Sequence, residues 1–301
     1  MMVGRFAPSP SGRMHLGNVF SALLAWLSVR SQGGKMILRI EDLDPERSKP
    51  EYIDLLRDDL SWLGLDWDEE MPPQSTRSSL YESYFETLPV YPCYCTRNEL
   101  HSASAPHSSD GSFLYPGICR NLTAEERALK TRKPSWRVQV PEREIAFTDG
   151  IYGPVRQRLD QCCGDFILRR SDGVYAYQLA VVCDDGLGGV TQVVRGRDLL
   201  DSTPRQIWLY EQFGFPVPEF YHVPLLVAPD GRRLSKRERD LDLGHLQQHF
   251  SSQELLGILA YSAGLIPECT AMSPKELIPV FSWDKIKAKD ISILEYLPGY
   301  V

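Results

Sequence analysis

The segment from His15 to Asn18, His-Leu-Gly-Asn, has the composition of a phosphate-binding turn. It follows an Ala-Pro-Ser-Pro-Ser-Gly loop that begins at Ala7, and it precedes an apolar helical pattern. A turn at a helix N-terminus that contains a glycine such as Gly17 lets backbone N–H groups approach phosphates. An imidazole donor stabilises negative charge that develops there. Taken alone, the segment is also compatible with an ordinary strand-to-helix turn that has a histidine cap.

A second candidate for phosphate chemistry lies more than 200 residues downstream. It is the basic segment 232–237, Arg-Arg-Leu-Ser-Lys-Arg, which follows an Asp-Gly turn. A flexible lysine such as Lys236 suits charge that moves in a transition state. The other interpretation is a basic surface loop, so the segment gains meaning only from its combination with the His15 segment.

Charged residues beside the first segment have complementary binding chemistry. Arg5 precedes the loop, and Glu41 follows a predicted strand. A guanidinium binds a carboxylate through two parallel hydrogen bonds, and a fixed carboxylate binds an ammonium group. Further along the chain, Tyr177 and Arg195 have simpler alternatives, which are core packing for the tyrosine and a surface salt bridge for the arginine.

Cysteines at short spacing indicate a possible metal site. Cys93-Tyr-Cys95 and Tyr115-Pro-Gly-Ile-Cys119 supply three thiols and one phenol. Zn²⁺ prefers four tetrahedral ligands and accepts thiolates readily. The fourth ligand could be the tyrosine or one of two intervening histidines, His101 and His107, and three buried free cysteines are the alternative. The remaining cysteines lack ligand spacing and are expected in the core: Cys162, Cys163, Cys183 and Cys269.

Strand and helix patterns alternate along most of the chain, which predicts a parallel sheet with crossover helices. The predicted strands are 4–7, 35–40, 166–169 and 174–179, the last two joined by a Ser-Asp-Gly hairpin. The predicted helices are 19–30, about 50–63, one from 203 that ends at Gly214, and 255–263. Three capping patterns predict helix starts: after Thr123, at Ser251 before the helix 255–263, and at Ser273-Pro274. The rhythm breaks between 91 and 134, which we interpret as an insertion.

The composition is that of a globular protein with a substantial core. Hydrophobic residues make up 43% of the 301 residues, and the net charge is −7. No apolar run is long enough for a membrane span, and the N-terminus lacks a signal-peptide pattern, so we expect a cytoplasmic protein. The acidic balance weakens but does not exclude nucleic-acid binding, because a local basic face meets phosphates. Candidate basic runs, each also compatible with a solvated surface, are 127–133, 195–197, 232–239 and 285–289.

Together the two phosphate-binding segments resemble the ATP signatures of class I aminoacyl-tRNA synthetases, in the glutamyl/glutaminyl branch. Segments 38–47, 177–185 and 194–204 are similar to further motifs of that branch. The chain departs from the family pattern at three positions. Asn18 replaces the final histidine of the first signature, Arg233 replaces a lysine, and Val181 stands where many members have a polar amide. The cysteine pattern resembles one subgroup, the glutamyl-queuosine tRNA(Asp) synthetases.

The resemblance implies an α/β fold, a Rossmann-type class I catalytic domain with a zinc-containing insertion and a small helical C-terminal region. The implied organisation is a first half of the catalytic domain (1–90), the insertion (91–134), a second half with the Leu-Ser-Lys loop (135–240), and the C-terminal region (241–301). Only 65 residues follow Lys236, so no anticodon-binding domain is expected.

The resemblance also implies a role for each motif residue. The catalytic group is His15, Asn18 and Lys236, which with Gly17 also binds ATP. The glutamate pocket is formed by Arg5, Phe6, Ala7, Pro8, Ser9, Glu41, Tyr177 and Arg195. The structural zinc ligands are Cys93, Cys95, Tyr115 and Cys119, with the tyrosine preferred as fourth ligand because of the subgroup pattern.

The expected activity is activation of L-glutamate by Mg²⁺-ATP without tRNA, followed by transfer of glutamate to queuosine at the wobble position of tRNA(Asp). We expect a monomer. Three alternatives remain open: a compact glutamyl-tRNA synthetase that charges a tRNA 3′ end, a catalytically silent zinc module that only binds RNA or a partner, and an adenylate-forming ligase that does not act on tRNA. A binding module has no need for two ATP signatures, which argues against the second alternative.

Overall fold

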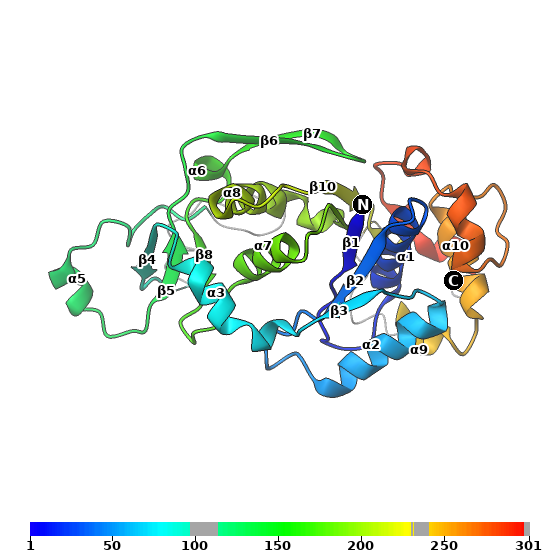
Figure 1. Cartoon of the computed structure of the whole chain (residues 1–301), viewed down its shortest axis with the longest axis horizontal. Coiled ribbons are helices and arrows are strands. Elements are labelled where there is room, and N and C mark those ends of the chain that lie inside the picture. The colour runs from blue at the N-terminus through cyan, green and yellow to red at the C-terminus, as the bar shows by residue number, and fades with distance from the viewer. Residues whose placement is uncertain (97–113, 230, 232–240, 298–301) are drawn as a thin grey trace.

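A parallel sheet lies at the centre of the computed structural model, which describes residues 1–96, 114–229, 231 and 241–297 (Figure 1). Within these residues the strand order is β10-β9-β1-β2-β3, and each neighbouring pair is parallel. The strands are β1 (Val3–Phe6), β2 (Lys35–Arg39), β3 (Glu69–Met71), β9 (Gln192–Gly196) and β10 (Glu219–Val223). The predicted α/β fold with a parallel sheet is confirmed.

Helices cover both faces of this sheet, and β2 shows why. Its side chains alternate, with Met36 and Leu38 in one buried cluster and Ile37 in the other, as expected for a strand buried on both faces. The first cluster contains α1 (Leu16–Arg30), α2 (Pro50–Leu63) and α10 (Ser252–Ser262). The second contains α3 (Ser78–Phe85), α7 (Tyr177–Leu187) and α8 (Thr203–Phe213).

Local signals set most helix ends. Gly64 and Gly214 follow α2 and α8 with φ of 71° and 68°, a left-handed conformation that glycine adopts without strain. Capping boxes open α5 (Ala124–Ala128), α10 and α11 (Pro274–Leu277). The predicted helix starts at these boxes are confirmed, and α1 begins three residues earlier than predicted.

The predicted strand 174–179 is wrong. β8 (Phe166–Arg169) forms, but only Tyr175 bridges back to Arg169 before the chain enters α7 at Tyr177. Leu179, Ala180, Val182 and Cys183 are fully buried on α7. Burial against the sheet and α8 therefore outweighs the strand preference of Val174, Tyr175 and Tyr177.

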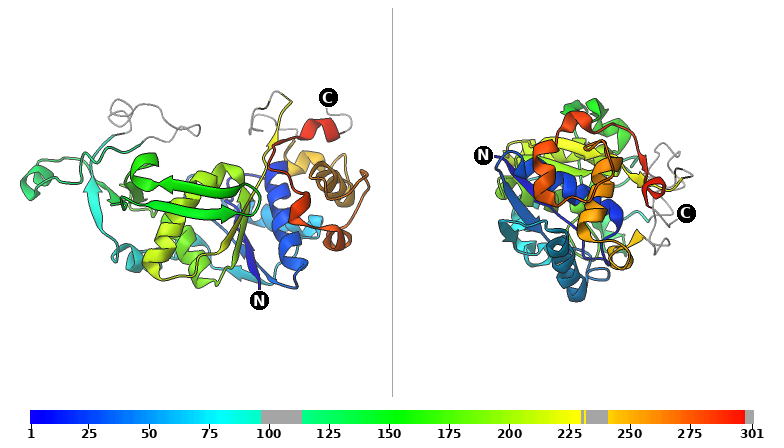
Figure 2. Two further views of the ribbon diagram at one scale, coloured as in Figure 1. Left: turned by 90° about the horizontal axis from the view of Figure 1, so that it is seen from above. Right: turned by 90° about the vertical axis from the view of Figure 1, so that its right-hand side faces the viewer.

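Two smaller antiparallel sheets lie outside the central sheet. One has the order β4-β5-β8, with β4 (Val90–Cys93) and β5 (Ser135–Val138) antiparallel. The other is the hairpin of β6 (Glu144–Asp149) and β7 (Gly153–Arg158), which we did not predict and which precedes the short α6 (Leu159–Cys162). Figure 2 shows α5 and the C-terminal helices at opposite ends of the long axis.

The C-terminal region packs onto the α1 face. It contains α9 (Leu243–Leu246), α10, α11 and β12 (Ile291–Ser292), which pairs in parallel with β11 (Leu226–Val227). Leu256 and Leu259 of α10 are fully buried in the same cluster as α1. Among the described residues, we find no helix with the length and apolarity needed to span a bilayer.

All seven cysteines are free thiols. Cys163 and Cys183 are buried as predicted, but Cys162 and Cys269 are exposed, so the core prediction is wrong for these two. Cys162 ends the short α6, and Cys269 lies in an exposed stretch after α10. A position at the end of a short helix explains the exposure of Cys162, and a position in a surface loop explains that of Cys269.

Candidate functional site

A cleft of about 460 Å³ opens at the ends of β1, β2 and β9. The strand order reverses at β1, since β2 lies on one side of it and β9 on the other, and ligands of open α/β sheets bind at such a point. The cleft brings together eleven residues of the predicted ATP and glutamate sites: Arg5, Phe6, Ala7, Pro8, Ser9, His15, Gly17, Asn18, Glu41, Tyr177 and Arg195. The twelfth, Lys236, lies outside the described residues.

The N-terminus of α1 forms one wall of the cleft. The Nδ1 atom of His15 accepts a hydrogen bond from the Gly17 N–H over 3.1 Å, and Oδ1 of Asn18 accepts from the His15 N–H over 3.3 Å. This reciprocal capping box satisfies two helix N–H groups. Because Nδ1 is an acceptor, a neutral His15 ring carries its proton on Nε2.

Gly17 leaves room for the His15 ring. A Cβ at position 17 would lie 3.0 Å from Cε1 of His15, a tight contact that the imidazole could relieve only by a small shift. Asn18 uses its oxygen in the cap, which leaves its amide NH₂ as the group for a ligand. Asparagine therefore preserves the helix start at the position where the family pattern has histidine.

A buried charge network supports the part of the cleft formed by the ends of β1 and β2. Asp185 accepts from Nε of Arg5 over 3.4 Å and forms an ion pair with Arg39, which donates to Oε1 of Glu41 over 2.9 Å. Burial acts to raise the pKa of Asp185, but Arg39 and Arg5 outweigh it and hold that pKa below its usual range. The carboxylate thus remains charged and fixes both arginines.

For the pKa of Glu41, burial outweighs the nearby positive charge. Burial raises its pKa, and the opposing effect of Arg39 is smaller. The side chain is 9% exposed and lines the cleft. An ammonium group of a ligand would supply the positive charge that favours the ionised carboxylate.

Arg195 is held from behind by a histidine. Its Nε donates to Nε2 of His222 over 3.1 Å, and a terminal nitrogen donates to Oγ1 of Thr203 over 2.9 Å. Nδ1 of His222 lies 2.6 Å from Oδ2 of Asp149. Burial, with a contribution from Arg195, lowers the pKa of His222 to about 4, so the ring is neutral, accepts at Nε2 and donates at Nδ1.

Sequence reasoning missed these supporting residues. Arg39 and Asp185 lie in segments 38–47 and 177–185, but the sequence alone assigns neither of them a role. The only local pattern at Asp149 is the glycine that follows it, which indicates a turn. No sequence pattern indicates a role for His222. Nothing in their spacing indicates contact, because the network joins strands that are distant in the sequence.

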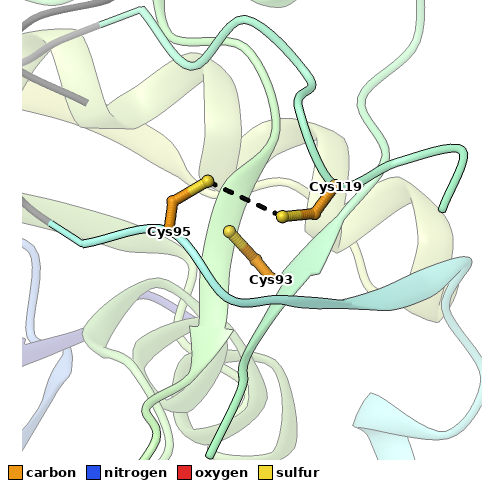
Figure 3. Close-up of side chains that lie close together, drawn as sticks. All are labelled: Cys93, Cys95 and Cys119. Carbon is orange, nitrogen blue, oxygen red and sulfur yellow. Dashed lines mark hydrogen bonds between the residues drawn. The ribbon is translucent and has the colours of Figure 1, made fainter. Parts of the chain in front are cut away.

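The three predicted cysteine ligands converge (Figure 3). The Sγ atoms of Cys93, Cys95 and Cys119 all lie within 4.8 Å of one another, and those of Cys95 and Cys119 are 3.6 Å apart. Four ligands about 2.3 Å from zinc lie roughly 3.8 Å apart in a tetrahedron. The observed spacing fits that geometry, so the three cysteines could hold a metal ion.

Tyr115 presents its oxygen to the same cluster. Its Oη lies 3.4 Å from Sγ of Cys93 and accepts from the Cys119 N–H over 2.9 Å. Arg137 lies over the tyrosine ring at 3.8 Å and donates Nε to Sγ of Cys93 over 3.3 Å. A guanidinium at this place favours a thiolate. The alternative ligands, His101 and His107, lie outside the described residues.

The family model for class I tRNA synthetases (E and Q), catalytic domain, matches residues 1–254. The glutamyl-Q tRNA(Asp) synthetase of Nitratidesulfovibrio vulgaris is 48% identical, over 94% of this chain and 92% of that protein. The protein of the same name from Symbiobacterium thermophilum is 50% identical, over 97% and 96%. The crystal structure of a glutamate tRNA ligase from Elizabethkingia meningosepticum, in complex with its amino acid, is 27% identical with a TM-score of 0.82, over 98% of this chain and 68% of that one.

The chain therefore belongs to the class I tRNA synthetase family for glutamate and glutamine, and within it to the glutamyl-Q tRNA(Asp) synthetases. The expectation of a ligase-type enzyme is confirmed. The family also agrees with the observed fold and with a cleft at the ends of the parallel strands.

Proposed function

We propose that this enzyme activates L-glutamate with Mg²⁺-ATP and transfers it to the queuosine base of tRNA(Asp). One observation carries the proposal: a single cleft is lined by Arg5, Arg195 and Glu41 beside the capped N-terminus of α1. This set matches an amino acid with a second carboxylate, bound next to a phosphate. The names of the relatives that match over almost their whole length support the same substrates.

Each charge of glutamate has a complementary group in the cleft. Arg5 and Arg195 come from the neighbouring strands β1 and β9, and we assign them to the side-chain carboxylate. Glu41, which follows β2, is assigned to the α-ammonium. The α-carboxylate then points toward the N-terminus of α1, where the partial positive charge of the helix favours phosphates.

Activation is an in-line displacement. An oxygen of the α-carboxylate bonds to the α-phosphorus of ATP, the bond from that phosphorus to pyrophosphate breaks, and glutamyl-adenylate forms. The Nε2–H of His15 donates to the α-phosphate as its charge grows, and Lys236 is assigned to the departing pyrophosphate. Magnesium bound with ATP supplies further neutralisation of phosphate charge.

Transfer uses a hydroxyl of the queuosine cyclopentenediol. Its oxygen attacks the adenylate carbonyl, the bond to AMP breaks, and the hydroxyl proton is lost as the ester forms. Positioning and charge stabilisation carry most of both steps. We also propose that activation does not require tRNA, which glutamate-dependent ATP–pyrophosphate exchange in tRNA-free enzyme would test.

We further propose that Cys93, Cys95, Cys119 and Tyr115 hold one structural Zn²⁺. The fit of the thiol spacing and of the tyrosine oxygen supports it. The ion would tie β4 to the 115–119 segment and so order the insertion, whose proposed limits are 91 and 134. The remaining proposed limits, at 240 and 241, separate the catalytic domain from the C-terminal region.

The decisive experiment supplies radiolabelled glutamate and ATP with two tRNA(Asp) preparations, one with queuosine and one without. We expect label on the queuosine form alone. Equal label on both forms would indicate charging of the 3′ end and would overturn the acceptor. Absence of both label and pyrophosphate exchange would favour a silent RNA-binding module, and exchange without label would indicate another acceptor.

A further inference from the structure

A second cavity, of about 480 Å³, lies on the C-terminal region beside the activation cleft. We call it the lysine cavity, and its defining residues are Tyr261, Lys285, Lys287, Lys289 and Tyr296. Pro224 lines both this cavity and the activation cleft. The two hollows therefore share a wall.

The side chain of Asp290 and a strand pairing fix the lysine segment to that wall. Asp290 accepts from the Leu225 N–H over 3.0 Å and from Nε of Arg197 over 2.6 Å. The next residue, Ile291, pairs with Leu226 where β12 meets β11. Leu225 and Leu226 both line the activation cleft. Lys289 is thus held one residue away from an anchor on the cleft wall.

The charge of the lysine cavity is largely unbalanced. Lys287 and Lys289 are exposed, and neither forms an ion pair with a described residue. Lys285 donates to the carbonyl oxygens of Leu265 and Val280 over 3.1 and 2.9 Å, so no carboxylate neutralises it there. Two acids also line the cavity, Asp290, which is paired with Arg197, and Glu295. Among the described residues, three lysines thus face one acid that forms no ion pair, in a chain whose net charge is −7.

Two aromatic rings stand beside the lysines. Tyr261 is 37% exposed, and its ring packs edge-on against Tyr296 at 5.7 Å between centroids. Lysines that contact phosphates and aromatic rings that stack on bases are the usual combination for unpaired RNA. An acidic peptide would use the lysines but would leave the rings without a matching partner.

We infer that the lysine cavity binds the sugar–phosphate backbone of the RNA substrate next to the nucleotide that enters the activation cleft. This inference rests on the proposed function, because a base modified in the cleft must leave its flanking nucleotides outside. The shared wall at Pro224 puts the lysines where such nucleotides emerge. Lys287 and Lys289 contact phosphates, and Tyr261 offers a surface for a base.

The test is the double variant K287A/K289A in the full chain, compared with K275A. Lys275 is an exposed lysine on α11 that does not line the cavity. We expect K287A/K289A to keep wild-type glutamate-dependent pyrophosphate exchange and to raise the KM for queuosine-containing tRNA(Asp) about tenfold. In filter binding, the slope of log K against log salt becomes shallower by about 0.7 per lost phosphate contact. K275A should match the wild type in all three measurements.

The outcomes separate this inference from the proposed function. A double variant with wild-type KM and wild-type salt slope overturns the lysine cavity as an RNA site, while labelling of queuosine-containing tRNA by the wild type leaves the proposed function standing. If the wild type labels no tRNA, the proposed function fails. The salt slope still decides the inference in that case, because it measures binding without transfer.

Discussion

The Nε–H of Arg195 donates to Nε2 of His222 over 3.1 Å, at the back of the cleft. This bond requires a neutral imidazole whose proton is on Nδ1, and Oδ2 of Asp149, 2.6 Å away, accepts that proton. A carboxylate at the end of β6 thereby sets the orientation of a guanidinium on β9. Asp149 is in turn fixed by the backbone N–H groups of Ile151 and Tyr152, at 3.0 and 2.9 Å.

Asp149→Asn should weaken glutamate binding without touching the cleft. The remaining oxygen would stay with the N–H groups of Ile151 and Tyr152, and the new NH₂ would face Nδ1 and the backbone N–H of His222. The ring proton would then move to Nε2 and oppose the Nε–H of Arg195. Loss of a hydrogen bond to a charged group costs about 1.5–3 kcal/mol, so we expect the KM for glutamate in pyrophosphate exchange to rise at least tenfold.

Asp165→Asn is the matched control for that variant. Asp165 is fully buried and accepts from Nε of Arg120 over 2.7 Å, but it lies beside the insertion and does not line the cleft. The Asp165→Asn variant should have a lower free energy of unfolding, while its KM for glutamate should stay at the wild-type value. A wild-type KM in Asp149→Asn would show that the tautomer of His222 does not govern Arg195.

The same histidine makes the protein sensitive to mild acid. Burial lowers the pKa of His222 to about 4, whereas the unfolded chain protonates near 6.5. Between these pH values the unfolded state binds more protons than the folded state. The contribution of His222 to the free energy of unfolding is therefore fully present above pH 6.5 and is lost as the pH falls toward 4. The full loss is about 3 kcal/mol. Urea unfolding at pH 7.5, 6.0 and 5.0 measures it.

His222→Gln should flatten that dependence, since glutamine does not titrate. The variant is expected to be less stable than the wild type at pH 7.5, and the difference should shrink at pH 5.0. Parallel curves for the two proteins would mean that another group controls the acid limb. Asp149 also has a pKa held below its usual range by His222 and backbone N–H groups, against the effect of burial, but its loss of charge occurs at lower pH.

Much of the fold could be predicted because its signals are local. Gly64, Gly214 and the capping boxes at Thr123, Ser251 and Ser273 each mark a helix end within a few residues. The helix after Gly173 could not be predicted, because an Asp-Gly turn followed by Val174 and two tyrosines favours a hairpin. This segment becomes the helix α7 because it packs against the sheet and α8, and no local sequence pattern reveals those contacts.

The candidate site likewise contains residues that the sequence predicts and residues that it does not. Residues inside the recognised motifs, such as Arg5, His15 and Glu41, do line one cleft. The groups that orient them could not be predicted, since Asp149, His222 and Asp185 each contact a partner from another strand or helix. Their contacts depend on strand order and register, which no periodic pattern encodes.

Position 18 offers a test that separates capping from ligand binding. Asn18→Ala removes the acceptor for the His15 N–H and should cost about 1 kcal/mol, with a higher KM for ATP. Asn18→Asp keeps the acceptor, so its stability should remain near that of the wild type. The added negative charge beside the phosphates should still raise the KM for ATP in pyrophosphate exchange.

Ser251→Ala supplies the control for position 18. Ser251 accepts from the Glu254 N–H at the start of α10 over 3.3 Å and does not line the cleft. This variant should lose a similar amount of stability with an unchanged KM for ATP. An Asn18→Asp enzyme with wild-type KM for ATP would place the nucleotide phosphates away from α1.

The fourth ligand of the cysteine cluster can be identified with conservative variants. Tyr115→Phe keeps the ring that packs under Arg137 and removes only the oxygen near Cys93. If that oxygen binds zinc, the variant should release zinc to a chromogenic chelator at least tenfold faster than the wild type. Tyr91→Phe is the control, because its hydroxyl donates to Asp165 over 2.5 Å in the same cluster but is not a proposed ligand. Equal release rates for all three proteins would exclude Tyr115 and direct the search for the fourth ligand to His101 and His107.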